Sequence, residues 1–295
     1  MSERIAFIGF GEAGQTISRG LVKEAEKPAI RTYDILLGTP AGARLEAAAG
    51  ELGVGLARDH VDAVREADLV MLTVTASSSL EATKSCLPGL RKGQIFVDMN
   101  SVSPKRKIET AALVAPTGAA YVDCAVMAPA APYLHKVPSL IGGPGAAALG
   151  PRAAALGMKM EFVSDEVGQA SAIKMFRSVV VKGLEALLVE SMTASAEYGV
   201  EDRVLASLQE TWPGLDWQKL SGYMIERVVS HGKRRAAEMR EVSETLQSVG
   251  MAPTMAAATA ERQQWVADLG LKIKTEDRVE LVKAIREAMV EKGGK

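Results

Sequence analysis

A glycine-rich turn directly after the first apolar run constrains the fold more than any other feature of the chain. Ile5–Ile8 has the character of a buried strand, a helical segment begins at Gln15, and between them lies Gly9-Phe10-Gly11-Glu12-Ala13-Gly14. In such a unit the first glycine permits a tight turn, the second lets a pyrophosphate approach the backbone, and the third lets the helix pack closely on the strand. The helix N-terminus offers unpaired amide donors to phosphate. The turn therefore predicts dinucleotide binding.

The first half of the chain alternates short strands with helices rich in alanine and leucine. Strands are predicted at Ile5–Ile8, Ile30–Tyr33, Leu69–Val74, Ile95–Val97, Tyr121–Val126, Ser139–Ile141 and Glu161–Val163, with helices such as Gln15–Lys23, Pro40–Ala49 and Val61–Ala67 between them. Continuous apolar runs are typical of strands covered on both faces. The alternation predicts an α/β fold, a Rossmann-type doubly wound parallel sheet.

Strand signals stop near residue 165, and only helical patterns follow. A long helix is predicted at Glu166–Tyr198, followed by Arg203–Leu208, Leu220–Val229, Arg234–Ser248, Ala256–Leu269 and Glu276–Glu291. A chain of 295 residues is long enough for two domains. We therefore predict a dinucleotide-binding Rossmann domain over residues 1–165 and a helical substrate and dimerisation domain over residues 166–295.

The charge balance argues against a nucleic-acid partner. Lys and Arg number 35 against 36 Asp and Glu, a net charge of −1, whereas nucleic-acid binders usually show a basic excess. The basic run Lys105-Arg106-Lys107 is interpreted as a solvated helix face. No apolar stretch approaches the roughly 18 residues of a membrane span, and the first apolar run is too short for a signal peptide. We expect a soluble, cytoplasmic protein without a membrane partner.

Cysteine and histidine usage gives no sign of a disulfide or a metal site. Cys86 and Cys124 lie in unrelated segments and are interpreted as small buried hydrophobic residues in a reducing compartment. The three histidines lie far apart in the sequence and form no metal-ligand pattern. No metal is expected.

Asp34, at the end of the second predicted strand, bears on the choice of cofactor. A carboxylate in this position accepts hydrogen bonds from the adenosine ribose hydroxyls and repels a 2′-phosphate, so NAD is favoured over NADP. The alternative is that Asp34 only caps a turn. Arg31 and Arg44 lie close in sequence and would reverse the preference if either reaches a 2′-phosphate.

Loops after the later strands are expected to line the same cleft, because ligands sit beyond the carboxyl ends of parallel strands. Two segments occupy such positions, Thr73-Val74-Thr75 and Asp98-Met99-Asn100-Ser101-Val102-Ser103-Pro104. The first segment and Asn100 are assigned to the cofactor, and Ser101 to the substrate. Ser103 before Pro104 also fits an ordinary helix N-cap, which is compatible with both assignments.

The long helix carries a polar stripe on a largely apolar background. The stripe is formed by Ser171, Lys174, Arg177, Ser178 and Lys182, at spacings of three and four residues. Such a stripe is costly unless it lines a wet cleft or meets an anion; the alternative is a solvent-facing stripe. A lysine whose pKa is lowered by burial or a neighbouring cation can exchange the proton of a substrate hydroxyl. Lys174 is therefore the candidate acid/base, with Arg177 and Ser178 as substrate contacts.

Taken together, these residues resemble the β-hydroxyacid dehydrogenase family, relatives of 6-phosphogluconate and 3-hydroxyisobutyrate dehydrogenases. The glycine turn is similar to the family's opening motif, Asp98–Pro104 is similar to its D-x-S-T-x-S-P segment, and Gly168-Gln169-Ala170 before Lys174 is similar to its catalytic lysine motif. The resemblance implies a nicotinamide-dependent oxidoreductase of a small hydroxy acid, with an all-helical second domain through which the chain forms a homodimer.

Two departures from the family pattern concern the substrate. The family's D-A-P-V-S-G-G motif is replaced by Asp123-Cys124-Ala125-Val126-Met127-Ala128-Pro129, which places Met127 at a substrate position, and Arg177 replaces an asparagine. A later family lysine would fall near Ala237. The run from His231 to Val242 instead resembles a bacterial subgroup with a distinctive phosphogluconate-dehydrogenase-like C-terminal domain, in which His231, Arg234 and Arg235 are candidates to rebuild the substrate pocket. The alternative is an exposed basic helix start.

Two other functions compete with the dehydrogenase. An imine reductase shares the architecture, but that branch commonly replaces the catalytic lysine, whereas Lys174 is retained here. A catalytically silent dinucleotide-binding module would bind the cofactor without turning over any hydroxy acid.

Overall fold

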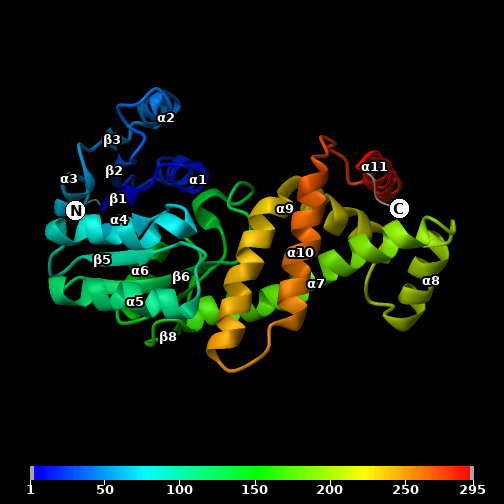
Figure 1. Ribbon diagram of the computed structural model, residues 1–295. Coiled ribbons are helices and arrows are strands. Elements are labelled where there is room, and N and C mark those ends of the chain that lie inside the picture. The colour runs from blue at the N-terminus through cyan, green and yellow to red at the C-terminus, as the bar shows by residue number, and fades with distance from the viewer. Residues whose placement is uncertain (1–2, 293–295) are drawn as a thin grey trace. The chain divides into compact units, whose positions relative to one another are not determined.

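The computed structural model describes residues 3–292, and its contacts divide the chain into two compact units, Met1–Lys174 and Met175–Lys295 (Figure 1). The division falls within the long helix α7 (Gln169–Ser195). The sequence-based boundary at residue 165 precedes this helix; as a division between a cofactor domain and a substrate domain it stays a prediction.

An eight-stranded sheet forms the centre of the first unit, in the order β3-β2-β1-β4-β5-β6-β7-β8. The first six strands are parallel, as predicted for a Rossmann fold, and their order is that of two mononucleotide-binding halves that meet between β1 and β4. Their bounds are β1 Arg4–Ile8, β2 Ala29–Tyr33, β3 Gly55–Leu56, β4 Leu69–Leu72, β5 Ile95–Asp98 and β6 Ala120–Val126.

The last two strands depart from the all-parallel prediction. Strand β7 (Ser139–Gly142) pairs antiparallel with β6, and β8 (Met160–Ser164) pairs parallel with β7. A parallel neighbour requires a crossover connection, usually a helix. The segment between β6 and β7 holds only the 3-10 turn Leu134–Lys136, so the chain turns back on itself instead.

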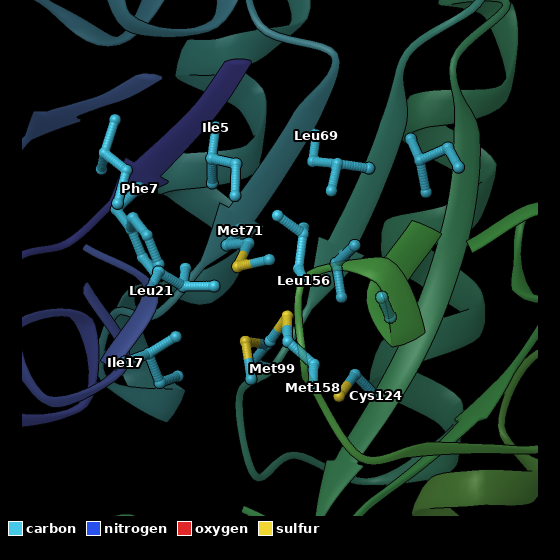
Figure 2. Packing of buried hydrophobic residues seen from close by; sticks show 14 of the residues in the cluster. Ile5, Phe7, Ile17, Leu21, Leu69, Met71, Met99, Cys124, Leu156 and Met158 are labelled. Carbon is cyan, nitrogen blue, oxygen red and sulfur yellow. The ribbon is translucent and has the colours of Figure 1, made fainter. Parts of the chain in front are cut away.

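Helices cover both faces of the sheet and bury it completely at its centre. They are α1 Glu12–Leu21, α2 Ala43–Leu52, α3 His60–Arg65, α4 Ser79–Cys86, α5 Pro104–Val114 and α6 Ala146–Ala155. Alternate residues along each strand point to opposite faces, so β1 gives Ile5 and Phe7 to one cluster and Ala6 and Ile8 to the other. Figure 2 shows the first cluster, in which Ile17 packs near Phe7. Both cysteines are buried and free, as expected.

The described part of the second unit contains helices and no strands: the rest of α7, α8 Glu201–Thr211, α9 Trp217–Ser248, α10 Thr254–Leu269 and α11 Arg278–Glu291. Its main apolar cluster includes Leu188, Ile225 and Ile285. Among residues 3–292, none of the helices has the length and apolar character that a membrane span needs.

One helix prediction was wrong: the two segments Leu220–Val229 and Arg234–Ser248 form the single helix α9. Gly232 lies in the supposed gap, but it serves close packing rather than a break. A Cβ at this position would lie 2.6 Å from the main-chain oxygen of Gln263 on α10, so the glycine allows the two helices to approach each other closely.

Candidate functional site

The glycine turn between β1 and α1 has the geometry that its sequence predicts. Gly9 has a φ of +90°, and a Cβ there would lie 2.8 Å from the main-chain oxygen of Thr73. A Cβ at Gly14 would lie 2.6 Å from the Gly9 oxygen, whereas at Gly11 it would meet nothing within 4 Å. The first and third glycines are therefore required by the fold itself. The second faces open space, which a ligand can occupy.

The N-terminus of α1 is available to an anion. Gly11, Glu12 and Ala13 are exposed, and no side chain caps the first turn. The first amides of an α-helix have no partner inside the helix and carry the positive end of its dipole. Together with the open space at Gly11, this arrangement fits a pyrophosphate.

Asp34 holds the glycine turn in place. Its Oδ2 accepts a hydrogen bond from the Phe10 amide at 2.8 Å, and its Oδ1 accepts one from the Leu36 amide at 3.0 Å. Asp34 is half-buried, and a carboxylate has lone pairs beyond these two bonds. The turn-capping role considered from sequence is therefore present, and it leaves room for a ribose contact.

The two cations near Asp34 have different surroundings. Arg31 pairs with Asp62 at 3.0 Å, whereas Arg44 on α2 is exposed. Tyr33 contacts His60 edge-to-face with ring centroids 4.6 Å apart, and burial lowers the pKa of that imidazole. An edge-to-face aromatic pair therefore lies just before the Asp34 carboxylate, at the carboxyl end of β2.

The loop after β4 supports the glycine turn through Thr73, whose hydroxyl donates to the Gly9 oxygen at 2.8 Å. Val74 is half-buried and Thr75 is exposed, with its hydroxyl 2.9 Å from that of Ser78. One of the residues predicted to touch the cofactor thus has a structural task as well.

The loop after β5 presents a buried acceptor. Asn100 is 5% exposed, its Nδ2 donates to Asp98 Oδ1 at 2.8 Å, and its Oδ1 has no hydrogen-bond partner among the described residues. A buried, unsatisfied acceptor costs about 1–3 kcal/mol, so a ligand that brings a donor is stabilised there. Ser101, the next residue, is half-buried.

Lys174 lies in the second turn of α7, whose start is tied to β6. Asp123 accepts hydrogen bonds from the Gly168 amide at 3.2 Å and from the Ser171 amide at 3.0 Å, and the Ser171 hydroxyl donates to it at 2.5 Å. Burial raises the pKa of the neighbouring Cys124 thiol to about 12, against the opposing positive charges of Lys107 and Lys174. The half-buried Lys174 ammonium is therefore close to β6.

The structure corrects the interpretation of Lys107 as part of a solvated face. The side chain of Lys107 is 0% exposed, and its ammonium lies 3.1 Å from Asp98 Oδ1 and 3.5 Å from Asp123 Oδ1. Sequence reasoning also assigned no role to these two aspartates, although both lie in quoted motifs. The position of Lys107 in its helix was the signal that could have indicated burial. Lys107 lies one turn after the N-cap Ser103, on the side of the helix that carries the buried Thr110 and not the exposed Lys105.

Four of the predicted substrate residues belong to the second unit. Arg177 is exposed and Ser178 is buried on α7, while Arg234 on α9 donates to Glu238 at 2.8 Å. Burial lowers the pKa of the His231 imidazole, and the positive charges of Arg227 and Arg234 lower it further. Met127, in the first unit, is half-buried after β6. That these residues complete a substrate site stays a prediction.

The residues of the predicted polar stripe on α7 have different surroundings. Ser171 meets Asp123, and Lys182 meets Glu238 at 2.5 Å, so both have the anion that burial requires. Arg177, by contrast, is exposed. Within the described part of the chain, His, Cys, Asp and Glu side chains form no group of three that suits a metal ion.

Two family models match parts of this chain. Residues 4–101 match the family described as NADP oxidoreductase, coenzyme F420-dependent, and residues 195–266 match a domain of unknown function, DUF1932. An uncharacterised 28.5 kDa protein of Methanothermus fervidus is 30% identical over 259 residues, which cover 87% of this chain and 96% of that protein.

Two solved structures are similar over nearly the whole chain. A conserved hypothetical protein from Sinorhizobium meliloti 1021 is 37% identical with a TM-score of 0.82, and the match covers 98% of this chain and 97% of that one. A conserved protein of unknown function, described as structurally similar to 3-hydroxyacid dehydrogenases, is 27% identical with a TM-score of 0.73, covering 91% and 100%.

More distant likenesses show the fold alone. A 3-hydroxyisobutyrate dehydrogenase of Mycobacterium tuberculosis is 18% identical with a TM-score of 0.74, covering 97% of this chain and 99% of that one. An imine reductase of Streptomyces aurantiacus, also 18% identical, has a TM-score of 0.54 and the same coverage.

The fold, the site and the relatives together identify the protein as an oxidoreductase of a class that uses a nicotinamide dinucleotide. The chain belongs to the β-hydroxyacid dehydrogenase-like family, in the subgroup whose C-terminal part is the DUF1932 domain.

Proposed function

We propose that the protein is an NAD(P)-dependent dehydrogenase that reversibly oxidises a small β-hydroxy acid or a related hydroxy-carboxylate, with Lys174 as the acid/base. The observation that carries this proposal is the attachment of α7 to β6. Asp123 binds the first turn of α7 and lies beside Asp98 in the sheet register. The half-buried Lys174 lies on α7. The start of α7 is bound to Asp123, and the loop that carries Asn100 follows Asp98, the sheet neighbour of Asp123.

The residues present fit a dinucleotide. The turn Gly9-Phe10-Gly11-Glu12-Ala13-Gly14 and the first turn of α1 would hold the pyrophosphate, Asp34 the adenosine ribose, and Thr73, Val74, Thr75 and Asn100 the nicotinamide half. When bound, the nicotinamide would supply hydride transfer to or from the substrate carbon. Everything else in the reaction falls to side chains of this chain.

Lys174 would exchange the proton. In the oxidative direction its neutral amine accepts the proton of the substrate hydroxyl, and in the reductive direction its ammonium returns a proton to the same oxygen. The Ser171 side chain is engaged by Asp123, so it orients the helix turn rather than the substrate.

Substrate recognition is assigned to Ser101 and Met127 in the first unit and to Arg177, Ser178, His231 and Arg234 in the second. The cationic residues suit a carboxylate, since guanidinium groups bind carboxylates through two parallel hydrogen bonds. The substrate motif of this chain presents the half-buried Met127 where the family has a serine, which favours an apolar group on the substrate at that point.

NAD is favoured over NADP because the Asp34 carboxylate would repel a 2′-phosphate. The exposed Arg44 is the residue that opposes this preference. Equilibrium binding of NADH and NADPH decides between the two, and replacing Asp34 by Asn should move the ratio of their affinities toward NADPH.

The protein is proposed to act as a cytoplasmic homodimer through its helical part. Four apolar residues lie exposed along α7, namely Ile173, Phe176, Val180 and Leu187. Their spacing places them along one side of the helix. A second copy of the chain is the partner that such a continuous apolar stripe favours. Sedimentation of the wild type and of a Val180→Glu variant tests this assembly.

Imine reduction is the second candidate. It is favoured by the loss of the family's Ser-Gly-Gly segment in favour of Met127-Ala128-Pro129, which removes hydroxyl and backbone contacts to a carboxylate. The same residues would then protonate or deprotonate nitrogen instead of oxygen.

One experiment separates these functions. Purified protein is incubated with NAD or NADP and a panel of small β-hydroxy acids, and with NADH or NADPH and the corresponding semialdehydes or cyclic imines, while cofactor absorbance is followed. Turnover of a hydroxy acid or semialdehyde supports the dehydrogenase, and turnover of imines alone supports the second candidate. Tight binding of NADH without turnover of any compound would identify a silent module.

A further inference from the structure

A fully buried lysine joins the two segments that the proposed function depends on. The Lys107 ammonium donates to the main-chain oxygen of Asp98 at 2.6 Å and lies 3.1 Å from the Asp98 carboxylate and 3.5 Å from that of Asp123. All three side chains are 0% exposed. Buried charges are costly unless they are paired and hydrogen-bonded, and each charge of this cluster has such partners.

The Asp98 arm of this cluster fixes the orientation of the Asn100 amide. Asp98 Oδ1 accepts hydrogen bonds from Asn100 Nδ2 at 2.8 Å and from the Asn100 main-chain amide at 3.0 Å. If the amide group were turned over, its oxygen would face a carboxylate oxygen at that distance, which is repulsive. Asn100 therefore has to present its oxygen, and not its NH2 group, on the other side.

The Asp123 arm holds the start of α7 through the Gly168 and Ser171 amides and the Ser171 hydroxyl. On the Asp98 side of the cluster, the Tyr121 hydroxyl donates a hydrogen bond to Asp98 Oδ2 at 2.8 Å. The loop after β5 and the helix that bears Lys174 are thus connected through one ammonium group.

We propose that Lys107 is a positioning residue: through Asp98 it holds Asn100 as a hydrogen-bond acceptor for a donor on the nicotinamide nucleoside, and through Asp123 it holds the turn before Lys174. This inference rests on the proposed function, because it requires a dinucleotide in the cleft. In the strand order β3-β2-β1-β4-β5-β6, the adenosine half lies over the first three strands and the nicotinamide half over the last three. Asn100 follows β5 and therefore belongs to the nicotinamide half.

Two groups of the nicotinamide nucleoside carry a donor, the carboxamide NH2 and the ribose hydroxyls. An Asn100 oxygen binds either of them and would repel a substrate carboxylate. The carboxylate of a hydroxy acid must therefore be bound elsewhere.

The test uses titration calorimetry of the full-length protein with four ligands. NADH has both donors, and its reduced 3-acetylpyridine analogue lacks the carboxamide N–H. ADP-ribose has the second ribose without the nicotinamide ring, and ADP lacks the whole nicotinamide nucleoside. The variants are Lys107→Met and the milder Tyr121→Phe, which removes one donor to Asp98 without changing the ring. Lys105→Met, an exposed lysine of the same helix, is the matched control.

Lys107→Met is expected to weaken NADH binding roughly threefold to tenfold, the worth of one hydrogen bond, and to leave ADP binding unchanged. Tyr121→Phe should act in the same direction with a smaller loss, and it keeps the test valid if Lys107→Met does not fold. A loss for NADH alone identifies the carboxamide as the donor. A loss shared by NADH, the analogue and ADP-ribose identifies a ribose hydroxyl. In an Asn100→Ala background, Lys107→Met should have no further effect on NADH binding, because its influence passes through that amide.

Three results would overturn the inference. An equal loss for ADP and NADH would show that the cluster only stabilises the fold. Unchanged NADH affinity in both folded variants would show that the orientation of Asn100 does not depend on Lys107. If the wild type binds none of the four ligands, the proposed function fails first, and the inference fails with it.

Discussion

Each unit of the protein contains a buried network of charges, and the two networks are built differently. In the first unit, Asp98 and Asp123 accept hydrogen bonds from main-chain amides of a loop and of a helix start. In the second unit, Lys182 pairs with Glu238 on α9. Arg235 donates two hydrogen bonds to the Glu185 carboxylate, one from Nε and one from Nη2. These second pairs join side chains of one helix to side chains of another.

The difference indicates different tasks. A carboxylate that binds main-chain amides fixes the position of a backbone segment, and with it the side chains that the segment carries. A pair between two helix side chains fixes the rotation and sliding of the helices relative to each other. Burial lowers the pKa of Lys182, and the Glu238 carboxylate opposes this shift by favouring the charged ammonium. The first network orients proposed site residues, and the second defines the packing of α7 on α9.

The largest expected effect is on catalysis, and it should differ between Lys174, in the part of α7 that belongs to the first unit, and Arg177, in the part that belongs to the second. Replacing Lys174 by Ala should lower kcat by about 10²–10⁴-fold, the usual contribution of a positioned acid/base, while NADH affinity is retained. Replacing Arg177, which lies beyond the boundary between the units, should mainly raise KM. Steady-state kinetics of both variants on the best substrate of the panel measures this split. Unchanged kcat in Lys174→Ala with intact cofactor binding would remove Lys174 from the mechanism.

The second network should dominate stability. Removing one partner in Glu185→Ala leaves the Arg235 guanidinium buried without its carboxylate, which should lower the free energy of unfolding by about 3–5 kcal/mol. Urea unfolding followed by circular dichroism measures the loss. The double variant Glu185→Leu with Arg235→Met removes both charges and should recover most of it. Failure of the double variant to recover would mean that the pair contributes more than the avoidance of a lone buried charge.

Replacing one tightly packed glycine in each unit, Gly9 in the first and Gly232 in the second, should have different effects on stability and on NADH binding. Gly9→Ala places a side chain at a φ of +90° and 2.8 Å from a main-chain oxygen, so it should cost of order 1–3 kcal/mol and abolish NADH binding. Gly232→Ala also creates a contact, 2.6 Å from the Gln263 oxygen, but the helix propensity of alanine returns about 1 kcal/mol. Its net loss should be smaller, and NADH binding should remain. Thermal unfolding and NADH titration of both variants check the contrast, which a loss of binding in Gly232→Ala would contradict.

The smallest effect concerns pH. Burial lowers the pKa of His135, whose Nε2 lies 2.8 Å from the Glu24 carboxylate, with Lys136 nearby. The unfolded chain then binds more protons than the folded one, so stability is complete above about pH 6.5 and falls as the pH drops toward the folded pKa. The loss is about 1.4 kcal/mol per unit of pKa shift.

The histidine prediction is checked by urea unfolding of the wild type and of His135→Gln over the range from about pH 7.5 to about pH 5. The variant should show a shallower decline than the wild type. His231→Gln, in the second unit, provides the comparison, because burial and three arginines lower the pKa of that imidazole as well. Parallel pH profiles for His135→Gln and the wild type would show that His135 does not contribute.

Local sequence determined the parts of this protein whose physical causes lie within a few residues of each other. The glycine turn after β1, the parallel arrangement of β1, β2, β4, β5 and β6, and the helical second half all follow from the spacing of glycines and from apolar periodicity. The two-residue strand β3 (Gly55–Leu56) was not predicted. The same information placed Lys174 on a long helix.

Tertiary structure decided which charges are buried and what they meet. Lys107 stands in a basic run with two neighbours that remain at least partly in solvent, and only the approach of β5 and β6 brings two aspartates to its ammonium. The close approach of α9 to α10 at Gly232 is likewise a contact between distant segments, and the antiparallel direction of β7 depends on a connection without a helix. Residues close in sequence share a helix or strand periodicity, whereas pairing across the sheet depends on contacts between distant segments, which local pattern does not record.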